Sequence, residues 1–359
     1  MANFNRFIDP KTKHSLIYQS KESVLITEDG NISYPVINGI PRFVSPEFYQ
    51  KSVNDITDEV QTGRSFGEKW CSPRNQALGS ADFDRSSLLE IFLAMLGCTS
   101  QKELKQLFKH ANNTLNAGCG VAWSEYLFDL NPEAERHCVD ISLSVEIARK
   151  NTAHIPHVTV SQASVFELPY PDEMFDVVYS GGVVHHTPDP KGAILGIGKK
   201  VASGGILGIY IYNRKPFIRE LCDQEVRKLT TEMNYDDCMK FSREMTMLGK
   251  ALKKINQPLV IEEDIDLLEI KAGKYDLQSF IYDHFVKCWY NPGQDDEYAH
   301  LVNQDWYHPR YASHHKKEEV LSWFEEAGFV NLKCIQPPGW EHSGYFVSGK
   351  KIVKKYSAG

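Results

Sequence analysis

Hydrophobic and polar positions follow two different periods along the chain, and the change of period divides it into segments. Between residues 111 and 213, short apolar runs of strand length alternate with stretches whose apolar positions have helical spacing. The runs are almost continuously apolar, which is typical of parallel strands covered on both faces. The sequence therefore predicts an α/β core in which the strand carboxyl ends, and any ligand, lie along one edge.

The flanking segments show other patterns. The chain begins with short β-like pieces, and helical spacing dominates both before the core and in a long stretch after it. Near the end, a predicted helix over 316–327 precedes two strands joined without a helix, which pair antiparallel if they are neighbours. We expect five segments: a small β module (1–46), a helical lid segment (47–110), the core (111–213), a helical cap insertion (214–310) and a C-terminal part that completes the sheet (311–359).

Composition and charge narrow the range of functions. The chain has 359 residues, of which 42% are hydrophobic and 24% charged, which indicates a folded protein with a sizeable core. Its net charge of −7 argues against nucleic acid and anionic membranes as partners. No apolar run reaches membrane-spanning length, and no apolar leader begins the chain, so we expect a cytoplasmic protein. The eight cysteines form no close pair, so we expect neither a disulfide framework nor a metal site.

The strongest chemical signal is the segment LNAGCG at 115–120. A predicted strand ends there, and the chain turns through Gly118 and Gly120 into a helix, so a ligand can approach the backbone closely. Free N–H groups at the start of a helix favour a carboxylate or a phosphate. Asp140 ends the next strand, about 20 residues on, at the spacing of a carboxylate that binds ribose hydroxyls. A plain strand–helix turn, with Asp140 as a helix cap, is the alternative.

The third position of the glycine pattern indicates which kind of nucleotide ligand the turn binds. Dinucleotide-binding turns place glycine or alanine where this chain has Trp123, and an indole there opposes close packing of helix and strand. This observation disfavours an NAD-dependent oxidoreductase and favours another adenosyl ligand.

Four motifs in order, LNAGCG, VDIS, LPYPDEMFDVVYS and GGVVHHTPDP, resemble those of class I S-adenosylmethionine-dependent methyltransferases of the type 11 group. The resemblance implies a doubly wound, Rossmann-like sheet of seven strands with the last one antiparallel. It also implies S-adenosyl-L-methionine (SAM) as cofactor. The cofactor contacts that it implies are Asn116, Gly118, Cys119, Gly120, Asp140, Ile141, Ser164, Val165, Ser180 and Gly181.

The chain departs from the family pattern at three positions. The family usually has an acid in place of Asn116 and often one in place of Ser164, while Ala122 stands where a third glycine is common. Asn116 and Ser164 can form hydrogen bonds but carry no charge. Because a charge-assisted bond contributes about 1.5–3 kcal/mol, we expect weaker cofactor binding.

Two segments ahead of the core carry further resemblances. Residues 15–44 are similar to a zinc ribbon of the Trm112 type, but its cysteine pairs would fall near Asp9 and Thr12 and near Ile26 and Asp29, where no cysteine stands. The resemblance thus implies a metal-free module with a structural or partner-binding role.

Residues 65–70 (SFGEKW) are similar to a segment that precedes the core in some of these enzymes. We expect Phe66 and Trp70 to form a lid over the cofactor, with an ordinary helix-packing pair as the alternative.

For the chemistry itself, His185 and His186 follow the fourth core strand at the ligand-binding edge. In-line methyl transfer to a hydroxyl or a protonated amine requires a base, and histidine suits that task. Histidines that bind loop carbonyls are the alternative. An aromatic and histidine-rich set is expected to hold a small, partly apolar acceptor: Tyr282, His284, Trp306, His308, Arg310 and His314.

Two other functions stay open at this point. One is a protein or RNA methyltransferase whose N-terminal module binds the partner. The other is a cofactor-binding protein without catalysis.

Overall fold

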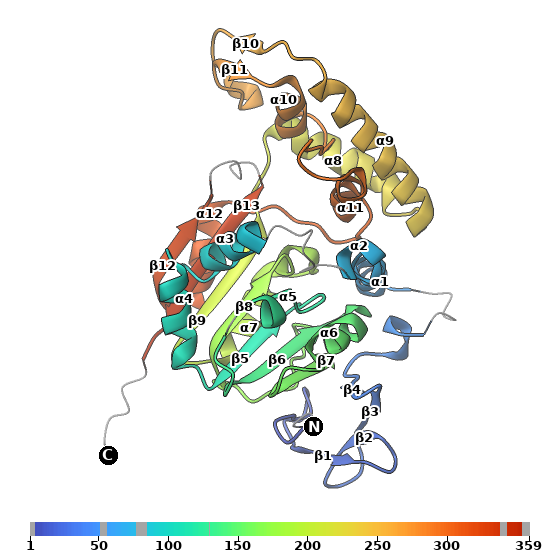
Figure 1. Cartoon of the computed structure of the whole chain (residues 1–359), viewed down its shortest axis with the longest axis vertical. Coiled ribbons are helices and arrows are strands. Elements are labelled where there is room, and N and C mark those ends of the chain that lie inside the picture. Colours follow the sequence, from blue (N-terminus) through green and yellow to red (C-terminus); the bar gives the residue numbers. More distant parts are fainter. Residues whose placement is uncertain (1–3, 51–55, 77–84, 129, 338–342, 354–359) are drawn as a thin grey trace.

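The computed structural model describes residues 4–50, 56–76, 85–128, 130–337 and 343–353. Its centre is one seven-stranded sheet (Figure 1). The strand order is β12 (Phe329–Ile335), β13 (Gly344–Lys351), β9 (Val201–Tyr212), β8 (Phe175–Gly181), β5 (Asn113–Ala117), β6 (Glu135–Asp140) and β7 (Val158–Gln162). Strands β5 to β9 pair in parallel, whereas β13 is antiparallel to both β9 and β12. The predicted α/β fold, with an antiparallel last strand, is confirmed.

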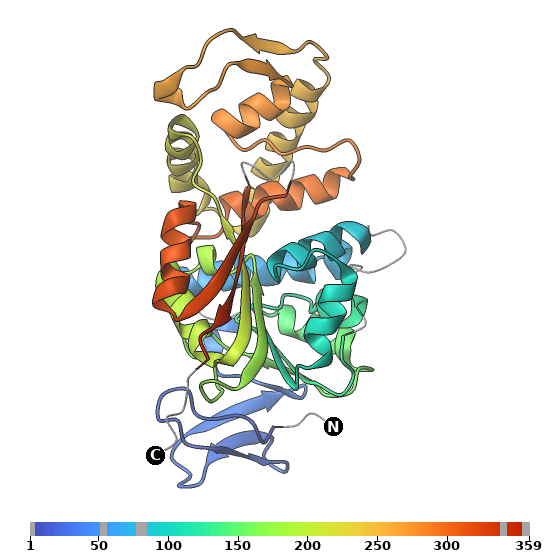
Figure 2. The ribbon, with the colours of Figure 1, turned by 90° about the vertical axis from the view of Figure 1, so that its left-hand side faces the viewer.

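Helices cover both faces of the sheet (Figure 2). One face packs against α7 (Pro190–Lys200) and α12 (Lys317–Glu326), and the other against α3 (Arg85–Met95), α4 (Gln101–Lys109) and α5 (Trp123–Leu127). The helix α6 (Ser144–Thr152) packs beside β7. Strand residues such as Leu115, Val178 and Leu207 have no exposed surface, which explains the continuous apolar runs in the sequence.

The N-terminal module is a four-stranded antiparallel sheet of β1 (Leu16–Gln19), β2 (Val24–Thr27), β3 (Ser33–Ile37) and β4 (Ile40–Pro41), followed by the short helix η1 (Pro46–Phe48). It docks on the β7 edge of the central sheet. Phe43 N donates to Gln162 O at 2.8 Å, and the buried Arg42 binds Gln162 Oε1 at 2.9 Å and also the carboxylate of Glu146. The module therefore extends the core instead of standing apart from it.

Hydrogen bonds close the two turns where ribbon cysteines would stand. Asp9 accepts from Thr12 N at 2.5 Å and from Thr12 Oγ1 at 2.6 Å. Asp29 accepts from Thr27 Oγ1 at 2.5 Å and from Asn31 N at 3.1 Å. These bonds hold the module's turns in place, while its likeness to a Trm112-type ribbon stays a prediction.

Two helical parts stand at the carboxyl edge of the sheet. The first is α1 (Asp58–Cys71), continued by α2 (Pro73–Gln76). The second is the cap, which comprises α8 (Phe217–Thr230), α9 (Tyr235–Lys253), β10 (Leu259–Ile261), η3 (Asp266–Leu268), β11 (Gly273–Tyr275), α10 (Leu277–His284) and α11 (Asp296–Tyr307). The hairpin of β10 and β11 was not expected in a segment predicted as helical. Parts of the predicted lid segment, 51–55 and 77–84, lie outside the described residues.

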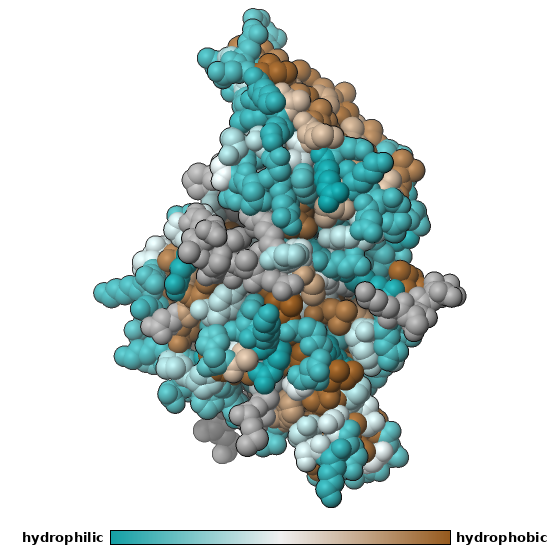
Figure 3. Space-filling view, turned by 45° about the vertical axis from the view of Figure 1, so that its right-hand side comes forward, coloured by the Kyte–Doolittle hydropathy of each residue, from teal (hydrophilic) through white to brown (hydrophobic). Residues whose placement is uncertain are grey.

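The surface of the cap carries apolar side chains along one edge (Figure 3). The exposed apolar residues of α8 and α9 include Leu229 and Met247. Among the described residues, no helix combines the length and apolar character needed to cross a bilayer.

Candidate functional site

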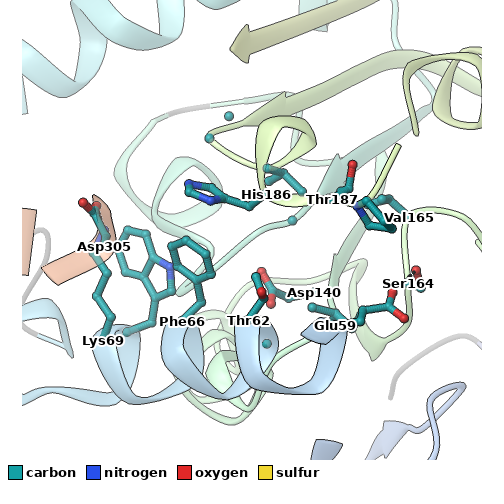
Figure 4. Close-up of a pocket in the computed structure, with 18 of the residues that line it drawn as sticks. Glu59, Thr62, Phe66, Lys69, Asp140, Ser164, Val165, His186, Thr187 and Asp305 are labelled. Carbon is teal, nitrogen blue, oxygen red and sulfur yellow. Dashed lines mark hydrogen bonds and ion pairs between the residues drawn. The ribbon is translucent and has the colours of Figure 1, made fainter. Parts of the chain in front are cut away.

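A cavity of about 230 Å³ opens at the carboxyl ends of the central strands. The loops that follow β5, β6, β7 and β8 form one wall, and α1 forms the opposite one (Figure 4). Tyr210 and Tyr212 at the end of β9, together with Asp305 of α11, complete the lining. The cavity therefore lies where parallel α/β sheets bind their ligands.

Eight of the twelve residues predicted to contact the cofactor line this cavity. They are Phe66, Trp70, Gly118, Asp140, Ile141, Ser164, Val165 and Gly181. The other four are Asn116, Cys119, Gly120 and Ser180. Cys119 packs in a core cluster with Cys138, and Ser180 is fully buried, so neither side chain is directed at a ligand in the cavity.

Asp140 is held by donors on both sides of its carboxylate. Oδ2 accepts from Gly120 N at 2.9 Å, and Oδ1 accepts from Ser142 N at 2.8 Å and from Ser142 Oγ at 2.7 Å. Both oxygens keep lone pairs for further donors. Asp140 therefore fixes the glycine turn and is also available to the cavity that it lines.

The glycine turn requires Gly118 for a steric reason. Its φ is +82°, and a Cβ atom there would lie 2.1 Å from Cγ2 of Val183. The amides of this turn are used inside the protein: Gly118 N and Cys119 N donate to Val139 O at 2.7 and 2.9 Å. The open row of amides expected from the sequence is therefore not presented by these residues, because the turn bonds back to β6.

Asn116 lies behind the turn and contacts an acid that the sequence analysis missed. Its Nδ2 lies 3.3 and 3.2 Å from the two carboxylate oxygens of Glu125, which also binds Ser124 and Tyr179. Burial raises the pKa of Glu125. This acid stands on α5, nine positions further along the chain, and lies outside the lining of the cavity.

Beside the predicted Phe66 and Trp70, helix α1 contributes three cavity residues that the sequence analysis did not identify, Glu59, Thr62 and Lys69. Glu59, Thr62, Phe66 and Lys69 share one helix face because they recur at intervals of three or four residues (Figure 4). Ser164 Oγ donates to Glu59 Oε1 at 3.2 Å, and Lys69 Nζ lies 2.5 Å from Asp305 Oδ2. From the sequence, only Phe66 and Trp70 of this helix are expected to lie over the cofactor.

The adjacent histidines differ in position. His186 lines the cavity and lies against Phe66, with ring centroids 4.6 Å apart. Its Nδ1 is 2.7 Å from the carbonyl of Tyr311, which can only accept, so Nδ1 carries the proton and Nε2 has a free lone pair. Burial lowers the pKa of His186 to about 3, so the ring is neutral.

His185 is directed away from the cavity and stacks on Tyr212 at 3.7 Å. Burial lowers its pKa well below the usual value. Neither ring nitrogen has a hydrogen-bond partner among the described residues.

Three residues predicted to hold the acceptor have other contacts. His308 binds Ser65 Oγ at 2.8 Å and so joins α1 to the end of α11. Arg310 binds the carboxylate of Glu232, and His284 packs against Phe280 with ring centroids 5.0 Å apart. The remaining three, Tyr282, Trp306 and His314, belong to an aromatic group behind Tyr212. All six lie outside the lining of the cavity as the described residues form it.

Comparisons with known proteins agree with this location. Residues 115–209, which run from within β5 into β9, match a family described as a methyltransferase domain. An uncharacterized protein of Synechococcus sp. is 36% identical over 103 residues, which cover 27% of this chain and 25% of that protein. The match thus spans about a quarter of the curated relative's length.

Solved structures with a similar course of the chain share little sequence with it. An O-methyltransferase family protein from Burkholderia thailandensis is 11% identical, with 82% of this chain and 64% of that chain covered and a TM-score of 0.43. A SAM-dependent methyltransferase from Aquifex aeolicus is 12% identical, with coverage of 76% and 100% and a TM-score of 0.37. Likenesses this weak say nothing about the acceptor.

Proposed function

We propose that this chain, whose residues 115–209 form a SAM-dependent methyltransferase domain, transfers a methyl group to a small-molecule acceptor bound between the sheet edge, α1 and the cap. The observation that carries the proposal is the cavity itself, because it brings Asp140, the glycine turn and His186 together within the matched domain.

The residues of the cavity fit SAM at three points. The carboxylate of Asp140 suits the ribose hydroxyls, and Ile141 and Val165 offer apolar contact to the adenine. Glu59, which already accepts from Ser164, supplies a carboxylate for the adenine amino group. Gly118 and Gly181, which line the cavity without side chains, let the methionine portion approach the backbone.

Bound SAM supplies a methyl group on a positively charged sulfur, and the protein's own part is to align the acceptor and exclude water. The neutral His186 offers Nε2 as a hydrogen-bond acceptor to a hydroxyl or amine, with the ring fixed by the Tyr311 carbonyl. Phe66 covers this ring and shields it from solvent. Lys69, fixed by Asp305 at 2.5 Å, closes the same side.

Binding and turnover test the proposal separately. Isothermal titration should show binding of S-adenosylhomocysteine (SAH), and incubation of the protein with labelled SAM and cell extracts should yield a labelled small molecule by mass spectrometry. Label found only in protein or RNA would refute the small-molecule assignment. Absence of SAH binding would refute the proposal as a whole.

The role of His186 has its own test, once an acceptor is known. A ring with a pKa of about 3 is a weak base at neutral pH, so His186→Ala removes a hydrogen-bond acceptor and should lower kcat by about 10-fold at saturating SAM. His185→Ala, which removes a ring outside the cavity, should act mainly on stability. SAH affinity should stay within twofold of wild type in His186→Ala. An unchanged kcat in that variant would eliminate the assigned role.

A further inference from the structure

Three buried cations surround one tryptophan beside the cavity. The side chains of Lys215, Arg219 and Lys287, called here the cation cluster, belong to residues that are only 3%, 1% and 4% exposed. Their charged groups lie 5.2, 5.3 and 4.5 Å from the ring centroid of Trp306. Burying several like charges together is costly unless counter-charges compensate them.

Each carboxylate near the cluster is engaged by at least one other donor, while Oδ1 of Asp223 and Oδ1 of Asp305 are buried and have no hydrogen-bond partner among the described residues. Asp223 accepts from Arg219 Nε at 2.7 Å, and Asp305 is paired with Lys69 at 2.5 Å. Glu220 accepts from the backbone N–H of Lys215 at 2.7 Å and lies 2.9 Å from the ring of His314. For the ammonium of Lys287, the described residues provide neither a hydrogen bond nor an ion pair, and burial lowers its pKa to about 8. Lys287 is thus the least compensated member.

Further hydrogen-bond donors at the cluster lack an acceptor. Arg219 Nη2 and Trp306 Nε1 are both buried, and neither has a partner within the described part of the chain. The Arg219 guanidinium, the Trp306 indole N–H and the Lys287 ammonium thus offer three kinds of hydrogen-bond donor. A ligand that satisfies them carries acceptor oxygens and negative charge, as a carboxylate or a phosphate does.

The cation cluster adjoins the cavity. Tyr212 lines the cavity and also lies 5.0 Å from Trp306, ring to ring. Asp305 also links the cavity to the cation cluster. It lies in the cavity wall with Lys69 (Figure 4), and it is the sequence neighbour of Trp306. The guanidinium of Arg219 also lies 5.0 Å from the ring of Tyr282, so aromatic faces flank the charges.

We propose that the methyl acceptor carries a carboxylate or phosphate group, which Lys287 and Arg219 bind beside Trp306. This inference rests on the proposed function, since it names the class of its substrate. Aromatic rings on either side favour an acceptor whose anionic group is joined to a flat or apolar part. Neutral analogues of the acceptor leave the cations uncompensated and bind more weakly.

The test uses thermal unfolding of the full chain with acetate and with inorganic phosphate, each against chloride at equal ionic strength. Wild type should melt at a higher temperature with at least one of the two anions. Lys287→Met should lose that shift, and without anions it should melt above wild type because an uncompensated charge is gone. The control is Lys250→Met, which removes a 40%-exposed lysine over the ring of Tyr290 and should keep the shift.

Each outcome decides the question. A shift with phosphate alone indicates a phosphorylated acceptor, and one with acetate indicates a carboxylate. No shift in wild type, or an equal shift in Lys287→Met, overturns the inference, as does a lower melting temperature of Lys287→Met without anions. A parallel melt with SAH separates the two proposals, because stabilisation by SAH without an anion effect leaves the methyltransferase assignment intact.

Discussion

Replacing Asp140 with asparagine tests the ribose assignment most directly. The substitution keeps the size of the side chain but removes its charge and one acceptor oxygen. In the protein, Asp140 accepts from Gly120 N at 2.9 Å on one side and from the N–H and hydroxyl of Ser142 on the other. Asparagine can keep its oxygen toward Ser142, but its NH₂ group then faces the N–H of Gly120.

Two effects of different size follow. An unsatisfied amide at Gly120 costs about 1–3 kcal/mol of folding stability. Loss of the charge-assisted bonds to ribose costs about 1.5–3 kcal/mol of binding free energy, which weakens SAH binding roughly 10- to 100-fold. Thermal melts without ligand report the first effect, and isothermal titration at a temperature well below the transition reports the second.

A matched control separates a local defect from a binding defect. Asp276 at the start of α10 accepts from Ser279 N at 3.0 Å and from Ser279 Oγ at 3.1 Å, so Asp276→Ala, which removes this cap, should cost about 1 kcal/mol of stability and leave SAH binding unchanged. Ser142→Ala removes one donor to Asp140 while keeping the carboxylate and should change SAH affinity no more than twofold. If Asp140→Asn binds SAH within threefold of wild type, the carboxylate does not hold the ribose.

The remaining predictions concern the adenine end and acid stability. Glu59→Gln keeps an acceptor for Ser164 but removes the charge, so SAH affinity should fall by about 1 kcal/mol, roughly fivefold, in isothermal titration; the neighbouring Asp58→Asn should not change it, and an equal loss in both would contradict the assignment. Burial lowers the pKa of His137 from 6.5 to about 4, so between these pH values the unfolded chain binds a proton that the folded chain does not. Stability should therefore fall by about 3 kcal/mol as pH drops through that window, and urea unfolding should show a shallower pH dependence for His137→Phe; equal slopes would argue against the shift.

The sequence predicts well those features of the fold that depend on residues close together in the chain. The buried strands show as apolar runs, and Asp140 ends one of them, so its place at the sheet edge follows from topology. The positive φ of Gly118 is likewise local, whereas the clash of a Cβ with Val183 and the hydrogen bond of its amide to Val139 O are not.

Contacts between segments far apart in the chain cannot be predicted from local sequence patterns, because they depend on how the elements pack. Glu59 and Ser164 are 105 positions apart, and only the docking of α1 across the strand ends brings them to 3.2 Å. The chemistry of His308 and Arg310 suits an acceptor site, but in the fold His308 binds α1 and Arg310 pairs with Glu232. The sequence does not predict the burial of Lys287, because a lone lysine in a helical insertion carries no local signal of burial.

Of the two acids that contact Asn116 and Ser164, only Glu59 lines the cavity, so it alone bears on the expectation of weak cofactor binding. Glu125 is buried beside β5 and fixed by Tyr179 and Ser124, so its position is part of the core. Glu59, in contrast, stands on α1, which is held over the cavity largely by bonds to residues 308–311, among them Gln61 Nε2 to the carbonyl of His308 at 2.9 Å. Affinity at the adenine end therefore depends on the contact between α1 and the cap. The cap also carries the cation cluster. A change that loosens the contact between α1 and the cap should therefore weaken both SAH binding and anion binding, although SAH itself contacts no residue of the cluster.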